Sequence, residues 1–187
     1  MKIERFPTLE TKRLLLRRMT IEDAPAVLRL FSDPEVTKDM GMEPFTSIEQ
    51  AEGLIGFMNG LFDDHKALRW AVIRKEDGVL IGTCGFNGWE VSRGSRAEIG
   101  YDLGREHWRQ GYMTEVLKEV LSYGFGTLGL NRIEAYTNLD ALPSMKLLER
   151  LGFTEEGILR GYALSHGEYV DNRCYSILRS EWEPQEK

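Results

Sequence analysis

The sequence predicts an α/β fold in which one mixed sheet carries helices on both of its faces. Three observations support this prediction: strand-like segments outnumber helical ones, helices lie between some of the strands, and no linker rich in Pro, Gly or Ser divides the 187 residues. The expected order along the chain is β-α-α-β-β-β-α-β-α-β-β. A chain of this length suits one core, so we expect a single domain over residues 1–187.

Hydrophobic periodicity and turn residues define the individual elements. Apolar residues three and four positions apart predict the helices, and short apolar runs bounded by turn residues predict the strands. Thr20 with Asp23 matches a helix cap, Asp77-Gly78 matches a hairpin turn, and Gly129 is suited to end the third helix. The expected strands span 13–19, 69–74, 79–86, 96–103, 132–137, 153–162 and 169–178, and the expected helices span 21–31, 47–62, 114–128 and 143–151.

Composition excludes several classes of protein. Apolar residues make up 42% and charged residues 29%, which argues against a disordered chain. The first twelve residues mix charged with apolar side chains and so lack the pattern of a signal peptide, and no stretch approaches the roughly 20 apolar residues of a membrane span. We therefore expect a cytoplasmic protein that binds no membrane. A net charge of −6 argues against nucleic-acid binding and is compatible with a cationic substrate.

The cysteines and histidines show no spacing that carries chemistry. Cys84 and Cys174 lie far apart and are expected to be buried, reduced thiols rather than a disulfide or a nucleophile. His65, His107 and His166 are scattered and form no recognisable zinc pattern. We expect no bound metal.

The most informative segment runs from residue 97 to 115, where a strand is followed by a turn that contains glycine and then by a helix. The first N–H groups of a helix lack partners within it and lie at the positive end of the helix dipole, so such a turn can bind phosphate. Gly111 allows close approach of a ligand to the backbone, and Arg109 can add charged hydrogen bonds. The alternative is that this glycine only turns the chain. The sequence contains neither a P-loop nor a dinucleotide fingerprint.

Several blocks of the sequence resemble the GNAT superfamily of acetyltransferases. Residues 108–113 resemble its motif A, Gln/Arg-x-x-Gly-x-Gly/Ala, with Gly111 as the central glycine, whereas Trp108 and Met113 depart from the outer positions. Ala-Glu-Ile-Gly-Tyr at 97–101 and Gly-Tyr-Met-Thr-Glu at 111–115 are similar to the RimJ/RimL branch. Residues 131–135 and 143–153 resemble a later family block. Together with 11–17 near the start, these blocks cover nearly the whole chain in the family's order.

The resemblance implies a GNAT fold and acetyl-CoA as cosubstrate. In that fold a mixed, mostly antiparallel sheet of about seven strands has two central strands that splay into a V-shaped cleft for pantetheine. The main chain of Tyr101, Asp102 and Leu103 is implied to line the acetyl-pantetheine arm. The residues implied to surround the phosphates are Arg109, Gln110, Gly111, Tyr112, Met113 and Thr114.

The same resemblance places Ser144 near the thioester sulfur, where it would orient the sulfur or protonate the leaving thiolate; capping of its helix is the alternative role. Ala141 stands where the family usually has asparagine, and Asn138 nearby is a second candidate for a hydrogen bond to pantetheine. The tyrosine that serves as general acid in many GNAT enzymes falls on Leu148. Proton donation is therefore left to Ser144, water or solvent.

Glu98 is the candidate general base. A carboxylate on a strand beside the cleft can accept the substrate proton, either directly or through water, and an ion pair with Arg96 or another cation is the alternative.

The expected reaction is direct attack of a primary amine on the thioester, without an acyl-enzyme. An α-amino group has a pKa of about 7.7 to 8.0 and lysine about 10.4, so deprotonating lysine at neutral pH costs roughly 3.5 kcal/mol more. This difference favours a protein or peptide N-terminus as acceptor. Two alternatives stay open: a small amine such as a polyamine, amino acid or aminoglycoside, and a catalytically silent CoA-binding module. The last two strands could also pair across a homodimer.

Overall fold

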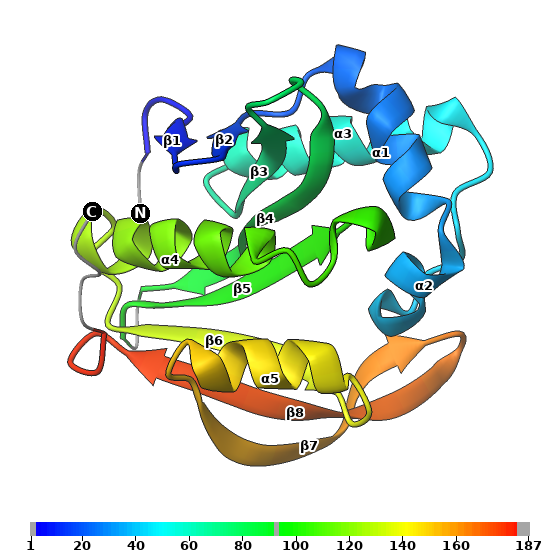
Figure 1. Cartoon of the computed structure of the whole chain (residues 1–187). Coiled ribbons are helices and arrows are strands. Elements are labelled where there is room, and N and C mark those ends of the chain that lie inside the picture. The colour runs from blue at the N-terminus through cyan, green and yellow to red at the C-terminus, as the bar shows by residue number, and fades with distance from the viewer. Residues whose placement is uncertain (1–2, 92–93, 183–187) are drawn as a thin grey trace.

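The computed structural model describes residues 3–91 and 94–182 (Figure 1). Eight strands form one sheet in the order β1-β2-β3-β4-β5-β6-β8-β7. Neighbouring strands are antiparallel except for β5 and β6, which are parallel. The strands are β1 (Leu9–Glu10), β2 (Leu14–Arg17), β3 (Leu68–Arg74), β4 (Leu80–Glu90), β5 (Arg96–Leu103), β6 (Arg132–Asn138), β7 (Thr154–Ser165) and β8 (Glu168–Leu178).

Helices lie on both faces of this sheet, as predicted. The α-helices are α1 (Ala24–Phe31), α2 (Pro34–Thr37), α3 (Ile48–Asp63), α4 (Tyr112–Gly126) and α5 (Leu142–Arg150). The 3-10 helices are η1 (Ile21–Asp23), η2 (Lys38–Met40) and η3 (Arg105–His107). Figure 1 shows α4 and α5 next to each other on one face, with the central strands behind them.

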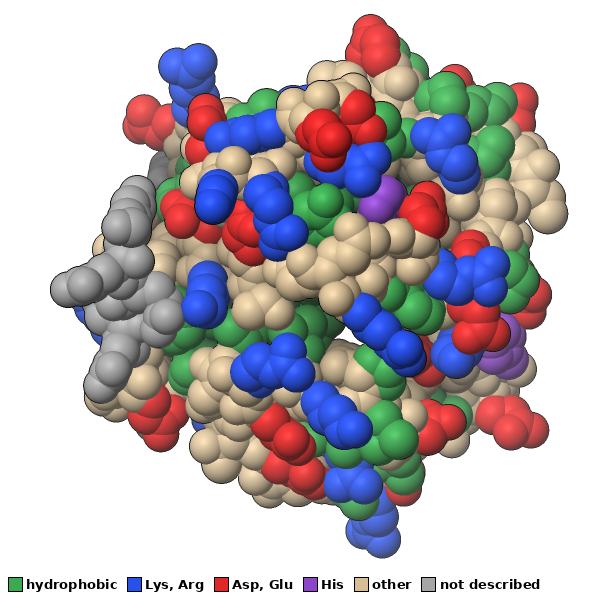
Figure 2. Space-filling model, in the orientation of Figure 1, with side chains coloured by type: hydrophobic (Ala, Val, Ile, Leu, Met, Phe, Trp, Pro, Cys, Tyr) green, Lys and Arg blue, Asp and Glu red, His purple; other side chains and the backbone are tan. Residues whose placement is uncertain are grey.

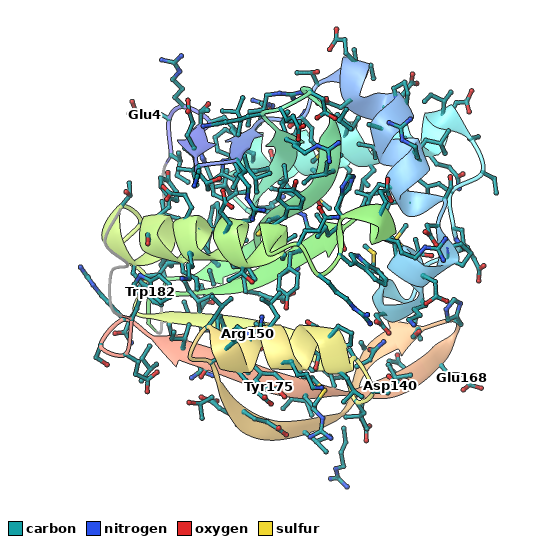
Figure 3. All side chains as sticks on the ribbon, viewed as in Figure 1. Glu4, Asp140, Arg150, Glu168, Tyr175 and Trp182 are labelled. Atoms are coloured by element: carbon teal, nitrogen blue, oxygen red, sulfur yellow. The ribbon has the colours of Figure 1, made fainter. Side chains whose placement is uncertain are left out.

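The sheet separates two hydrophobic cores, because alternate residues of each strand point to opposite faces. On the face of α4 and α5, Trp70 and Ile99 pack with Val116 and with Leu148 of α5. On the other face, Ala71 packs with residues of α1 and α3. Figure 3 shows Tyr175 of β8 beneath α5, where it belongs to the first core. The two faces of β5 therefore meet different surroundings.

The predictions lack the short elements β1, α2, η2 and η3. The sequence predicts about seven strands, whereas the structure has eight, because β1 is too short to show a periodicity and exists through its pairing with β2. The segment between the predicted helices 21–31 and 47–62 contains α2. Asp33 caps α2, its side chain accepting a hydrogen bond from the Glu35 N–H at 3.0 Å, and Pro34 occupies the first turn, where a missing N–H costs nothing.

Strands β7 and β8 form a long hairpin that extends past its predicted ends and reaches η2. His166 and Gly167 at its turn both have positive φ, 49° and 84°. The His166 Nδ1 lies 3.0 Å from Glu43 Oε1 in the loop after η2. Figure 3 labels Glu168 at this tip and Asp140 near the start of α5. The tip of the hairpin thus lies against the loop that follows η2.

Candidate active site

The two parallel strands separate midway along the sheet. Pairing between β5 and β6 runs from Arg96 with Arg132 to Glu98 with Glu134 and then stops, although β5 continues to Leu103 and β6 to Asn138. Figure 2 shows a hollow in the surface between α4 and α5, with Lys and Arg side chains near its edges. The resemblance implies such a V-shaped cleft, and the register places its fork at Glu98.

The main chain of β5 beyond the fork is available to a ligand. The N–H of Gly104 donates to the Ile81 carbonyl at 2.9 Å, and main-chain groups in an antiparallel ladder alternate in direction. This alternation directs the groups of Tyr101 and Leu103 toward β6, into the cleft, and those of Asp102 toward β4. The Leu103 carbonyl already accepts a hydrogen bond from Trp108 Nε1 at 2.8 Å. Tyr101 and Leu103 thus fit the predicted role of their main chain.

The turn before α4 has the form expected of an anion site. Gly111 is the N-cap with φ of 77°, a left-handed conformation, and no side chain caps the helix. The first N–H groups of α4 therefore lack helical partners. A Cβ built on Gly111 would meet only Arg13, at 3.6 Å, so the space next to this glycine is open. Arg109 is exposed with φ of 60°. These features fit the pyrophosphate of acetyl-CoA.

Arg13 is a site residue that sequence reasoning missed. Its guanidinium lies 4.3 Å from the centre of the Tyr112 ring, donates to the Gln110 carbonyl at 3.0 Å and pairs with Glu115 at 2.7 Å. Burial works against ionisation of Glu115, but hydrogen bonds from Thr11 and Arg13 hold the pKa of Glu115 below its usual value. Arg13 lies just before β2, about a hundred residues away in sequence from the turn that it contacts. Local sequence patterns carry no signal over such a separation.

Ser144 lies across the cleft from β5 and bonds to a tyrosine. Its hydroxyl is 2.6 Å from the hydroxyl of Tyr101. Burial raises the pKa of Tyr101, so this phenol is neutral at physiological pH. The N-cap of α5 is Ala141 rather than Ser144, which removes the N-cap explanation for the serine. The sequence identified Tyr101 through its main chain only. Its side chain joins β5 to α5 at the place where the resemblance puts the thioester.

Glu98 projects from the face of β5 opposite α4. Ala97 and Ile99 belong to the core beneath α4, so the alternation of the strand places Glu98 on the other face. Its carboxylate accepts a hydrogen bond from Asn87 Nδ2 at 2.8 Å. Within the described part of the chain no cation lies within 4 Å of it, and Arg96 pairs with Glu134 instead, at 3.8 Å. Among the described residues, Glu98 thus does not form the ion pair that was the alternative to a catalytic role.

The remaining predicted residues take varied positions. Asn138 points to the face of Glu98, where its Nδ2 donates to the Asp39 carbonyl at 3.3 Å, so this structure does not bring it to the Tyr101–Ser144 side of the cleft. Gln110 bonds the Glu106 carbonyl through its side chain, at 2.8 Å. Met113 is buried in the core beneath α4, and Thr114 follows it in the first turn of α4.

Neither cysteine is suited to nucleophilic catalysis. Both are free and buried, as predicted, and burial raises the pKa of the Cys84 thiol to about 12. Among the described residues, no group of three or more His, Cys, Asp or Glu side chains is arranged to hold a metal ion. In the same part of the chain, no helix combines the length and apolar character needed to cross a bilayer.

The forked pair of parallel strands, the start of α4 without a side-chain cap and the Tyr101–Ser144 hydroxyl pair agree with the cofactor cleft that the resemblance to acetyltransferases implies. Comparison with known proteins agrees: residues 13–154 match the model of the acetyltransferase (GNAT) domain. The chain belongs to the GNAT family, in its RimJ/RimL-like branch, and is an acetyl-CoA-dependent N-acetyltransferase.

The similarity to known relatives extends over nearly the whole chain. The chain is 46% identical over 175 residues to the uncharacterized N-acetyltransferase p20 of Bacillus licheniformis, covering 94% of this chain and 98% of p20. It is 44% identical over 174 residues to YoaA, an uncharacterized N-acetyltransferase of Bacillus subtilis, covering 93% and 98%. A solved GNAT-family acetyltransferase from Bacillus anthracis superposes with a TM-score of 0.82 at 26% identity, covering 94% of this chain and 100% of that one.

Proposed function

We propose that this enzyme acetylates the N-terminal α-amine of a polypeptide, with Glu98 as the general base. The observation that carries the proposal is the position of Glu98 at the fork of β5 and β6, on the face opposite α4 and α5. Acetyl-CoA would reach the fork from the α4 side and the amine from the other side. At that meeting point, a carboxylate that pairs with no cation in the described part of the chain suits an ammonium acceptor.

The residues divide the chemistry between the two faces. Acetyl-CoA supplies the activated acyl group as a thioester. Glu98 takes one proton from the acceptor ammonium, and the freed lone pair attacks the thioester carbonyl. As the C–N bond forms and the C–S bond breaks, the nitrogen loses its second proton to solvent. Ser144, held by Tyr101, passes a proton to the leaving thiolate, and solvent restores it. In the net reaction one proton from nitrogen is released and one remains on the CoA thiol.

Exposed apolar side chains beside the acceptor face favour a polypeptide over a small amine. On the β7–β8 hairpin, Tyr162 is 47% exposed, Leu164 62% and Tyr169 78%. Grouped apolar surface of this kind typically marks contact with a partner. A relative points the same way: YdaF of Bacillus subtilis, whose assignment as a ribosomal N-acetyltransferase is provisional, is 34% identical over 108 residues, 57% of this chain.

A matched peptide assay tests this proposal. The purified enzyme is incubated with acetyl-CoA and peptide pairs that contain one lysine and differ only in a free or a formylated N-terminus, alongside a panel of polyamines, amino acids and aminoglycosides. Mass spectrometry then locates the acetyl group. We expect acetylation of the free N-terminus alone. Acetylation confined to small amines would overturn the polypeptide acceptor.

The role of Glu98 is tested separately with Glu98→Gln, which keeps the shape and removes the base. We expect kcat to fall by about 100-fold, within the range usual for general base catalysis, and KM for acetyl-CoA to stay the same. Glu52→Gln, an exposed site on α3, is the matched control. Unchanged turnover of Glu98→Gln across pH would remove Glu98 from the mechanism.

A further inference from the structure

A chain of polar side chains runs across β3, β4 and β5 and ends at Glu98. It begins at Arg69 on β3 and Asp102 on β5, a salt bridge in which each side chain is only 8% exposed. Arg69 Nε also donates to Thr83 Oγ1 at 3.1 Å, and that hydroxyl donates to Asp102 at 2.9 Å. The third contact of the guanidinium goes to Asn87 Oδ1, at 2.8 Å. The buried charges are therefore paired and extensively hydrogen-bonded.

The chemistry of Asn87 fixes the direction of the chain. A guanidinium offers only donors, so the amide oxygen of Asn87 must face Arg69. The amide nitrogen then points to Glu98 and donates to its Oε1, at 2.8 Å. Reversing the amide would set donor against donor at one end and oxygen against carboxylate at the other. Asn87 thus connects the buried guanidinium of Arg69 to the carboxylate of Glu98.

The backbone leaves room for these contacts at one glycine. Gly100 follows Glu98 by two positions on the same face of β5. A Cβ at this position would lie 2.7 Å from Asn87 Nδ2 and 2.8 Å from an Arg69 guanidinium nitrogen. Both side chains therefore pass directly over Gly100. Any larger residue would displace the link to Glu98.

We propose that Asn87 and Arg69 are positioning residues that hold the Glu98 carboxylate in a fixed orientation at the fork. This inference rests on the proposed role of Glu98. A buried ion pair is weak evidence for a stabilising role, because desolvation offsets much of its attraction. A positioning role explains why the chain of contacts extends beyond the buried pair, through Asn87, to a carboxylate beside the cleft.

A double-mutant cycle on Asn87 and Glu98 tests this proposal. Asn87 is exposed, so Asn87→Ala should fold normally, which thermal unfolding will verify. We expect kcat with a peptide acceptor to fall about 10-fold, KM for acetyl-CoA to stay unchanged, and the acidic limb of the pH–rate profile to move to higher pH. This shift follows because a carboxylate that loses a hydrogen-bond donor is protonated more readily.

The cycle separates failure of this inference from failure of the proposed function. If Asn87 acts through Glu98, Asn87→Ala has no further effect in the Glu98→Gln background. Equal effects in both backgrounds, or an unshifted pH profile, would overturn the positioning role while leaving Glu98 as base. If Glu98→Gln alone leaves turnover unchanged, the base itself is wrong, and the positioning role is overturned with it. The acceptor is judged independently, by the position of the acetyl group on the peptides.

Discussion

The two sides of the fork are built in different ways. On the cofactor side, the turn at 109–111 and the start of α4 present main-chain groups from consecutive residues. On the proposed acceptor side, hydrogen bonds connect Glu98 to side chains from three strands, with Arg69 and Asp102 separated by 33 positions. A main-chain site tolerates changes of side chain and fails when backbone conformation changes. A side-chain site fails when one of its side chains is replaced. Four variants test this contrast.

The largest expected effect comes from Arg69→Met on the acceptor side. The variant leaves the Asp102 carboxylate buried without its cation, which typically costs about 3–5 kcal/mol. We expect the free energy of unfolding, measured by urea titration, to fall by about that amount. Arg69→Met combined with Asp102→Leu should recover most of the loss, because no unpaired charge stays buried. A double variant as unstable as the single one would contradict this explanation.

On the cofactor side, Gly111→Ala should weaken acetyl-CoA binding and leave the acceptor side intact. A Cβ has space there, but the left-handed φ of 77° costs a non-glycine residue roughly 1–2 kcal/mol. We expect KM for acetyl-CoA to rise about 5- to 30-fold as the turn relaxes. Gly126→Ala is the matched control, since Gly126 lies within α4 with open space around it. Its KM should match the wild type, and an equal rise in both variants would exclude the turn as the cause.

Tyr101→Phe should have a smaller effect on kcat. The effect should be confined to protonation of the leaving thiolate. The change removes the hydrogen bond to Ser144, a contact typically worth about 0.5–1.5 kcal/mol, so we expect kcat to fall by up to roughly 10-fold. The kcat of Ser144→Ala should fall by a similar factor. The kcat of the double variant should fall little further, because the two hydroxyls act as one unit. Independent, multiplying losses in steady-state kinetics would show that they act separately.

Sequence predictability follows the same contrast between the two sides. Periodicity and turn residues locate most helices and strands, and a local strand-turn-helix pattern locates the cofactor turn, because both signals lie within short windows. Arg13, Arg69 and Asn87 escaped prediction because only sheet pairing brings them to the site. The position of Glu98 on a strand identifies it as a candidate, but the sequence does not identify Asn87 as its hydrogen-bond partner. Element β1 was missed for the same reason, since pairing alone creates it.

The smallest expected effect concerns a second charged cluster on the Glu98 face, near the outer strands. Arg132 and Ser176 donate to Glu156 and lower the pKa of its carboxyl to about 2. A carboxyl whose pKa is depressed by folding adds stability above its unfolded pKa, about 4.5, and loses it as pH falls toward 2.

Because the Glu156 side chain is 42% exposed, solvent screens the pair and the gain is small. In Glu156→Gln, the free energy of unfolding should therefore change slightly less with pH between 4.5 and 2. Glu52→Gln should match the wild type. Turnover with peptides should not change, because among the described residues Glu156 bonds to Arg132 and Ser176 and to neither Asn87 nor Glu98. A large loss of kcat would instead extend the catalytic side-chain site across β6 to the outer strands, and the contrast between the two sides would need to be redrawn.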